Sequence, residues 1–336
     1  MTEYSFLRYI LAMLAILLIV FEATPKTFRK IIAKTKGYFI VLIGSVVVLA
    51  LLFAPLVVIE NKNYNFFSIF QSFASARWLL IAIVVLILIA NIFSIFSRKK
   101  EELLSGTCLT LLVASALLIL LKTFTNNEGN YGWGLVIAVI LLSLIAFTSL
   151  ILSAKGKEFS VYDIAEDGIL IAAAFVLNFI KVPLGSTGGS ANFQMLPLFI
   201  IALRHGPTQG FICGGIIYGL LTCLTDGYGI IYYPFDYMIG FGSVIVMGFF
   251  RQFILNEKIN NYNLKGILFI IISGFISTVV RLIGGCISSI LYYGASLGYA
   301  LLYNLPYIGI SGAIGIIAII AMYGPLIKIN KRFNKE

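Results

Sequence analysis

Long apolar runs, separated by short polar connections, dominate the chain. The first half contains five such runs, at residues 5–22, 37–59, 77–96, 103–121 and 133–153. The second half contains six, at residues 162–181, 193–204, 207–225, 231–250, 265–292 and 298–327. Because about 20 apolar residues span the hydrocarbon core of a bilayer, the pattern predicts an all-α, polytopic integral membrane protein with about eleven transmembrane segments.

A change in the chain marks the start of the sixth run. Ser160 and Asp163 have the spacing of a helix capping box, and a carboxylate suits the first turn of a helix. We therefore expect an N-terminal membrane region of about five helices at residues 1–158, with no role indicated. A six-helix substrate-binding membrane domain is expected at residues 159–336.

Basic residues crowd alternate connections between the runs. They follow the first, third and fifth runs, and they return after the seventh, the ninth and the last. The positive-inside rule then places the N-terminus outside and the C-terminus in the cytoplasm. The high Ile, Asn and Lys content is compatible with an AT-rich bacterial genome, so we expect a multi-pass protein of the bacterial plasma membrane.

Composition narrows the class further. The chain is 60% hydrophobic and 11% charged, which excludes a soluble fold, and its net charge of +10 belongs to the connections rather than to a nucleic-acid site. The cysteines lie within apolar runs without a CxxC pattern, so they indicate neither a disulfide framework nor a zinc site. No phosphate loop occurs, no cofactor is expected, and the one histidine, His205, is expected to be a solvated turn residue.

Asp236 is the most informative polar residue, because it lies inside the ninth run. A carboxylate there costs roughly 2.5 to 3.5 kcal/mol unless it meets a partner, water or a cationic ligand. Aromatic and amide side chains gather in the outer halves of this and other helices, namely Tyr218, Tyr228, Tyr232, Tyr237, Tyr293, Tyr299 and Asn304. An acid surrounded by aromatic rings suits a flat organic cation, although the tyrosines alone also fit an interfacial belt. Arg281 is expected either to pair with Asp236 or to snorkel.

Each of two further sets of mostly small residues has two possible structural interpretations. The stretch with Gly185, Ser186, Gly188, Gly189 and Asn192 forms either a lid over the site or a flexible connector. Gly168 and Ala172 have small-xxx-small spacing, which suits either close packing within the chain or a docking face for a partner protein.

Residues of about 160–330 resemble a substrate-binding S component of energy-coupling factor vitamin transporters, in the thiamine-specific branch. The strings that carry the resemblance are GGSANFQMLPLFIIALRHGPTQGFICGGIIYGLL, FDYMIGF and YALLYNLPY. The resemblance implies six helices, a site under a lid loop that faces outward, and capture of thiamine outside the cell. It also implies reorientation in the membrane, driven by a transmembrane coupling subunit and two ATPase subunits, with Gly168 and Ala172 at the docking face.

The resemblance also implies roles for individual residues. Asp236 stands where an acid faces the thiazolium ring and is followed by Tyr237, while Tyr299 and Asn304 match residues that contact the substrate. Tyr218 and Tyr228 fall near other aromatic contacts. Three departures exist: the acid is usually Glu, a His is expected at Gly285, and a Trp is expected near Tyr293. A thiamine fragment, a precursor or another vitamin is therefore an alternative ligand.

Rival functions belong to other classes of protein. A self-sufficient secondary transporter would have an inverted repeat with broken helices in both halves, but comparable Gly and Pro interruptions occur only in the second half. A membrane enzyme would need a His, Cys or paired-acid constellation, which the sequence lacks. A purely structural subunit would not need a buried acid such as Asp236.

Overall fold

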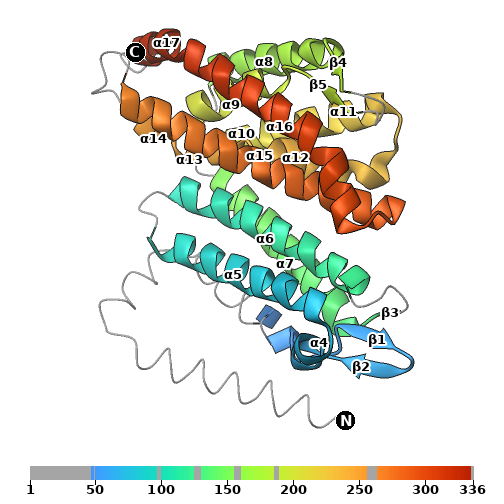
Figure 1. Cartoon of the computed structure of the whole chain (residues 1–336). Coiled ribbons are helices and arrows are strands. Elements are labelled where there is room, and N and C mark those ends of the chain that lie inside the picture. The colour runs from blue at the N-terminus through green and yellow to red at the C-terminus, as the bar shows by residue number, and fades with distance from the viewer. Residues whose placement is uncertain are drawn as a thin grey trace, which may run out of the picture. The chain divides into compact units, whose positions relative to one another are not determined.

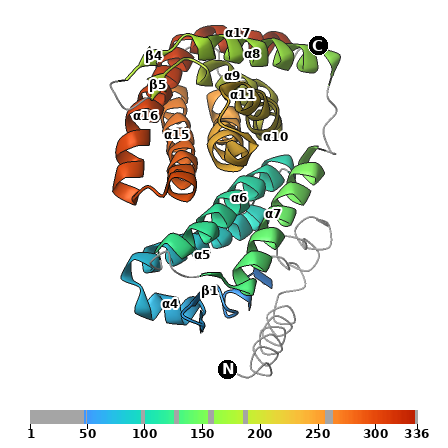
Figure 2. The same cartoon turned by 90° about the vertical axis from the view of Figure 1, so that its right-hand side faces the viewer.

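A computed structural model describes residues 47–333, apart from residue 49 and residues 97–99, 125–129, 155–159, 185–188 and 256–262. The described residues form two compact units, of which one ends at Leu152 and the other runs on from Ser153 and also includes Lys99–Leu109. Both units are built mainly from helices (Figures 1 and 2). This confirms the predicted class of a helical, multi-pass membrane protein.

In its described residues from 57 onward, the N-terminal half combines four helices with a small antiparallel sheet. The helices are α4 (Phe66–Ser72), α5 (Ala74–Phe96), α6 (Lys100–Phe124) and α7 (Trp133–Ala154). The strands are β1 (Val57–Ile59), β2 (Lys62–Tyr64) and β3 (Asn130–Tyr131), in the order β2-β1-β3. In Figure 1, α5 and α6 run side by side.

One prediction for this half was wrong. The run at residues 37–59 was expected to be one helix, but the described part of that helix ends at residue 51, and Pro55 follows in extended chain. Val57–Ile59 then pairs with Lys62–Tyr64 across a two-residue turn, in which Glu60 and Asn61 have φ values of 49° and 63°. Positive φ at both turn positions matches the twist of a β-hairpin, and the apolar run hid this strand.

The C-terminal unit contains ten α-helices, three further helical segments and one short hairpin among its described residues. The first elements are α8 (Val161–Phe179), β4 (Val182–Pro183), β5 (Ser190–Ala191), α9 (Met195–His205), α10 (Pro207–Phe211), η2 (Ile212–Tyr218) and α11 (Gly219–Asp226). The next are η3 (Ile230–Tyr232), η4 (Tyr233–Ile239), α12 (Gly240–Gly242), α13 (Ile245–Phe249), α14 (Arg251–Ile254), α15 (Leu264–Tyr293), α16 (Leu297–Ala321) and α17 (Tyr323–Phe333). Helix α9 is buried along almost its whole length, so it forms the centre of the unit.

Within the described part of the chain, five helical stretches are long and apolar enough to cross a membrane. They are Trp133–Ile151, Pro207–Asp226, Ile230–Phe249, Leu264–Tyr293 and Leu297–Ala321. Three shorter apolar helices lie at Ala76–Ile89, Gly106–Leu121 and Met195–His205. The count of eleven stays a prediction, because the first predicted helix lies outside the described residues. The run expected at residues 298–327 is divided at Met322, where Pro325 suits the first turn of a new helix.

Helix α8 begins with the capping box that the sequence predicts. The Ser160 hydroxyl accepts a hydrogen bond from the Asp163 backbone N–H at 3.1 Å, and the Asp163 carboxylate accepts one from the Ser160 N–H at 3.3 Å. Two of the unpaired donors at the helix start are thereby satisfied.

A buried polar cluster then joins α8 to the end of α9. Arg204 binds both carboxylate oxygens of Glu166, with Nη2 at 2.7 Å from Oε2. The His205 Nδ1 atom lies 2.6 Å from an Asp167 oxygen. The expectation that His205 is solvated is wrong, because His205 is only 7% exposed and the carboxylates of α8 lie against it.

The π-helical segment η2 lies in very close contact with the π-helical segment η4 and with α12, which follows η4. A Cβ atom on Gly214 would lie 2.8 Å from the Phe241 carbonyl oxygen, and one on Gly215 would lie 2.8 Å from the Met238 carbonyl oxygen. The Tyr233 hydroxyl donates to the Gly215 carbonyl at 3.2 Å, which gives this oxygen a second kind of partner inside the bundle. The glycines therefore fix where η4, the segment that carries Asp236, lies.

Candidate binding site

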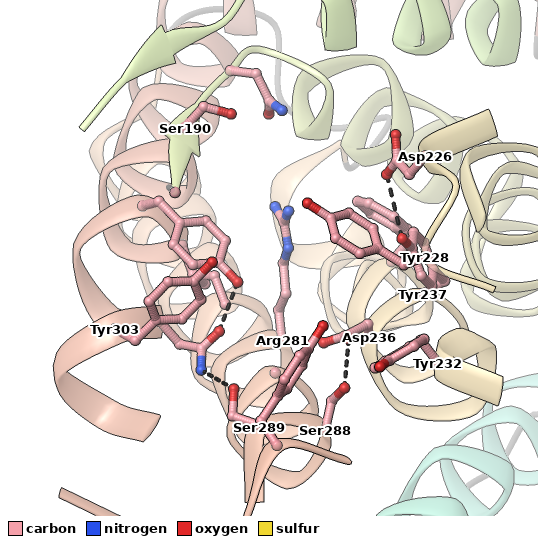
Figure 3. Close-up of a pocket in the computed structure, with 18 of the residues that line it drawn as sticks. Ser190, Asp226, Tyr228, Tyr232, Asp236, Tyr237, Arg281, Ser288, Ser289 and Tyr303 are labelled. Carbon is pink, nitrogen blue, oxygen red and sulfur yellow. Dashed lines mark hydrogen bonds between the residues drawn. The ribbon is translucent and has the colours of Figure 1, made fainter. Parts of the chain in front are cut away.

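A cavity of about 680 Å³ lies within the C-terminal unit. Its volume is within the range of about 300 to 1,000 Å³ that is typical of small-molecule sites. Residues from α8, the β4 and β5 hairpin, η4, α15 and α16 form its walls (Figure 3). The charged groups of its lining are two carboxylates and two cations, namely Asp226, Asp236, Lys181 and Arg281.

Asp236 reaches the cavity from η4, next to Tyr237. The Ser288 hydroxyl on α15 donates a hydrogen bond of 2.5 Å to Asp236 Oδ2. No ion pair involves Asp236 within the described parts of the chain. The Tyr237 hydroxyl donates to Asp226 Oδ2 at 3.4 Å. Asp236 is therefore oriented by a neutral donor, and its charge is available to a cation in the cavity.

Arg281 is buried, with 9% exposure, and its guanidinium points into the open centre of the cavity (Figure 3). Its Cζ atom lies 4.9 Å from the centroid of the Phe241 ring, which is a cation–π distance. Its Nη1 atom has no hydrogen-bond partner among the described residues. Both expectations for Arg281 were wrong, because it neither forms an ion pair with Asp236 nor extends to the surface.

Three of the predicted aromatic residues line the outer part of the cavity. Tyr228, Tyr293 and Tyr299 all line it, and each exposes more than half of its surface. The Tyr232 ring stacks on Tyr293 with centroids 5.7 Å apart and meets Tyr228 edge to face at 6.4 Å. These rings together present aromatic faces at the cavity entrance.

Tyr218, by contrast, lies behind the cavity wall. It has no exposed surface and is absent from the lining. Its hydroxyl donates to Gln194 Oε1 at 2.6 Å, and its ring packs edge to face against Phe241 at 4.9 Å. Tyr218 therefore supports two lining residues instead of reaching the cavity itself.

Asn304 lines the cavity, but its amide is already engaged. Its Nδ2 atom donates to Ser289 Oγ and to the Ala300 carbonyl, both at 2.8 Å, and its Oδ1 atom accepts from the Tyr307 hydroxyl at 2.6 Å. A Cβ atom on Gly285 would lie 2.9 Å from Asn304 Oδ1. Asn304 thus occupies space that a side chain at position 285 would need.

The predicted lid falls partly on described residues. Gly185, Ser186 and Gly188 lie outside the described residues, while Gly189 and Asn192 line the cavity. A Cβ atom on Gly189 would lie 2.5 Å from the Tyr307 ring. The Asn192 amide donates to Asn178 Oδ1 at 3.1 Å, and its own Oδ1 has no hydrogen-bond partner among the residues that the structure describes. This end of the stretch therefore forms part of the cavity wall.

Several lining residues were not selected from the sequence, among them Asn178, Lys181, Gln194, Asp226, Ser288, Ser289 and Tyr307. Helical spacing could have identified some of them. Tyr303 and Tyr307 follow Tyr299 at intervals of four residues on α16, and such residues share one helix face. A polar stripe of this kind on an apolar helix indicates a face that does not contact lipid.

Gly168 and Ala172 lie on the exposed face of α8. A Cβ atom on Gly168 would meet no atom within 4 Å. The buried residues of α8 are Asp167, Ala174 and Asn178. Gly168 is therefore not needed for close packing against another described residue of the chain.

Known proteins resemble the part of the chain that holds this cavity. A family model described as thiamine transporter protein (Thia_YuaJ) matches residues 164–332, half of the chain. The thiamine transporter ThiT of Bacillus subtilis (strain 168) is 28% identical over 161 residues, which covers 42% of this chain and 80% of the relative. The solved structure of ThiT from Listeria monocytogenes is 26% identical and covers 50% of this chain and 94% of that chain, with a TM-score of 0.42. From the family match, the chain belongs to the thiamine transporter protein family and is a membrane transport protein rather than an enzyme.

Proposed function

We propose that the C-terminal domain, residues 159–336, captures thiamine from outside the cell in the cavity around Asp236. In this proposal the chain is the S component of an energy-coupling factor transporter, and separate subunits hydrolyse ATP. The family match supports thiamine as the ligand, and the lack of a phosphate loop in the sequence supports a separate energy source.

The observation that carries the proposal is a carboxylate, Asp236, that faces a cavity with aromatic walls and has no cationic side chain paired to it among the described residues. A thiazolium ring could pair with Asp236, because a cation in the cavity would offset the cost of burying this charge. Tyr237, Tyr293 and Tyr299 would stack on the rings of the ligand, with Tyr228 at the entrance and Tyr218 supporting the wall. Asn304 would bind the ligand through the free lone pair of Oδ1.

The remaining parts of the proposal concern partners and orientation. The N-terminus would face outward and the C-terminus the cytoplasm, with the wall segment Gly189 to Asn192 on the outer side. The transmembrane coupling subunit would contact the exposed face of α8 at Gly168 and Ala172, whose small size permits close approach of a second helix. The shorter acid, Gly285 and Tyr293 support a thiamine precursor or another vitamin as the second candidate ligand.

Calorimetric titration of the purified chain in detergent tests the ligand. Thiamine, its pyrimidine and thiazole halves and riboflavin are titrated into the unmodified chain, Asp236→Asn and the matched control Asp226→Asn. We expect thiamine to bind, and we expect Asp236→Asn to weaken binding about 10- to 100-fold, because an interaction with a charged partner contributes about 1.5 to 3 kcal/mol. Asp226 is exposed, so its variant should change affinity less. Equal affinity of a folded Asp236→Asn protein would contradict the proposal.

A further inference from the structure

Arg281 is the least satisfied charged group of the cavity. It is 9% exposed, its Nη1 atom has no hydrogen-bond partner among the described residues, and its guanidinium points into the cavity (Figure 3). Guanidinium groups remain protonated in proteins, so this donor cannot escape its need for an acceptor by losing a proton. A buried charged donor without an acceptor is unfavourable, which indicates that an acceptor enters with the ligand.

The cation–π contact does not supply that acceptor. The guanidinium carbon of Arg281 lies 4.9 Å from the centroid of the Phe241 ring. Hydrogen bonds from a guanidinium lie in its plane, so the aromatic ring offers no acceptor to Nη1. The contact with Phe241 thus positions Arg281, while its Nη1 atom has no hydrogen-bond partner among the described residues.

The opposite charges of the cavity are held apart. Asp236 is bound by Ser288, and Arg281 is fixed against Phe241, without an ion pair between the two. A ligand with only a positive charge would satisfy Asp236 but would leave Arg281 unpaired and would be repelled by it. A ligand with a cationic ring and a separate anionic group would match both.

We infer that Arg281 forms an oxyanion subsite in the cavity, so that the preferred ligand is a phosphate ester of thiamine rather than thiamine itself. This inference rests on the proposed function. Thiamine carries a hydroxyethyl group that can bear a phosphate, and a guanidinium binds phosphate oxygens through parallel charge-assisted hydrogen bonds. The Ser190 side chain, which also lines the cavity, lies across the open centre from Arg281 (Figure 3) and provides a neutral donor for the same group.

Comparison of thiamine with thiamine monophosphate tests the subsite. Both are titrated calorimetrically into the full chain and into Arg281→Gln, Arg281→Lys and the control Lys181→Gln, which removes the exposed cation of the lining. The full chain should bind the monophosphate about tenfold or more tightly than thiamine. Arg281→Gln should abolish this preference while it still binds thiamine, Arg281→Lys should retain part of it, and Lys181→Gln should change it less than about threefold.

Each other outcome has a distinct meaning. If the full chain binds thiamine as tightly as the monophosphate, the inference is wrong, whatever the variants do. A preference that persists in a folded Arg281→Gln protein would also overturn it, because the phosphate would then lie elsewhere. If inorganic phosphate raises thiamine affinity to the level of the ester, the subsite belongs to a free anion and not to an ester. Failure of the full chain to bind either compound would refute the proposed function itself.

Discussion

At the residue scale, Gly285 and Asn304 determine how much space the cavity floor offers. The position of Gly285 is one turn beyond Arg281 on α15, and its missing side chain leaves room for the Asn304 amide. That amide in turn holds Tyr307 through a hydrogen bond of 2.6 Å. A side chain at position 285 therefore acts on the ligand through Asn304 and Tyr307.

A substitution at Gly285 should weaken both folding and binding. Gly285→Ala places a Cβ atom 2.9 Å from Asn304 Oδ1, and overpacking of this kind typically costs about 1 to 3 kcal/mol. We expect a lower melting temperature and weaker thiamine binding, and a larger effect of Gly285→His. The control is Gly298→Ala on α16, where a Cβ atom meets no atom within 4 Å. Equal melting temperatures and affinities for Gly285→Ala and Gly298→Ala would show that Asn304 moves aside freely.

Sequence patterns identified residues that line the site better than they identified the side chains that those residues contact. The sequence singled out Asp236, Tyr237, Tyr228, Tyr293 and Tyr299 because an intramembrane acid among aromatic residues is unusual, and all five line the cavity. The lack of a hydrogen-bond partner for Arg281 Nη1 among the described residues could not be predicted, since it depends on the distance between α15 and η4. The position of Tyr218 behind Gln194 likewise depends on packing between helices that are separate in sequence.

At the element scale, the polar cluster between α8 and α9 attaches the start of α8 to the end of α9. The paired hydrogen bonds between Arg204 and Glu166 join the first turns of α8 to the last turn of α9. The Arg204 side chain is 7% exposed and that of Glu166 is 30% exposed. Removal of one partner leaves a largely buried charge without its counterion.

Glu166→Gln should therefore destabilise the protein more than removal of both charges. We expect Glu166→Gln to lower the free energy of unfolding by about 1 to 3 kcal/mol. The double variant Glu166→Gln with Arg204→Gln should lose less than the sum of the two single variants, because each single variant leaves one charge of the pair behind and the double variant removes both. Unfolding in detergent by denaturant, analysed as a double-mutant cycle, measures this coupling. Strict additivity would show that the pair contributes nothing specific.

Most elements could be predicted from apolar run length, but some could not. Ser160 and Asp163 form the predicted cap because capping depends on residues three positions apart. The hairpin at residues 57–64 was missed because a short strand in an apolar run resembles the end of a helix. The π-helical form of η2 and η4 was not predicted either. It occurs together with glycine contacts between segments that are separate in sequence, and such contacts cannot be inferred from run length.

At the scale of the whole molecule, the described residues separate into two compact units, of which the second comprises Lys99–Leu109 and the chain from Ser153 onward. The cavity is lined only by residues of this second unit, all of them beyond Ser153. We therefore expect a shortened chain of residues 153–336 to bind thiamine within about threefold of the full chain, a difference of less than about 1 kcal/mol. Calorimetric titration of both chains in the same detergent measures this. A folded short chain that has lost binding would show that the N-terminal region contributes to the site, as expected for a two-half secondary transporter.

The glycine contacts between η2 and η4 also bear on how the cavity accepts a ligand. Main chain lies against main chain at Gly214 and Gly215, so no side chain can rearrange between these glycines and the segment that carries Asp236 and Tyr237, and the backbone of that segment is held rigidly. A backbone segment that keeps its shape when the cavity is empty loses little conformational freedom on binding, which favours tight capture. The adjustments needed to admit a solute are then left to the side chains of the lining, above all to the exposed rings of Tyr228, Tyr293 and Tyr299.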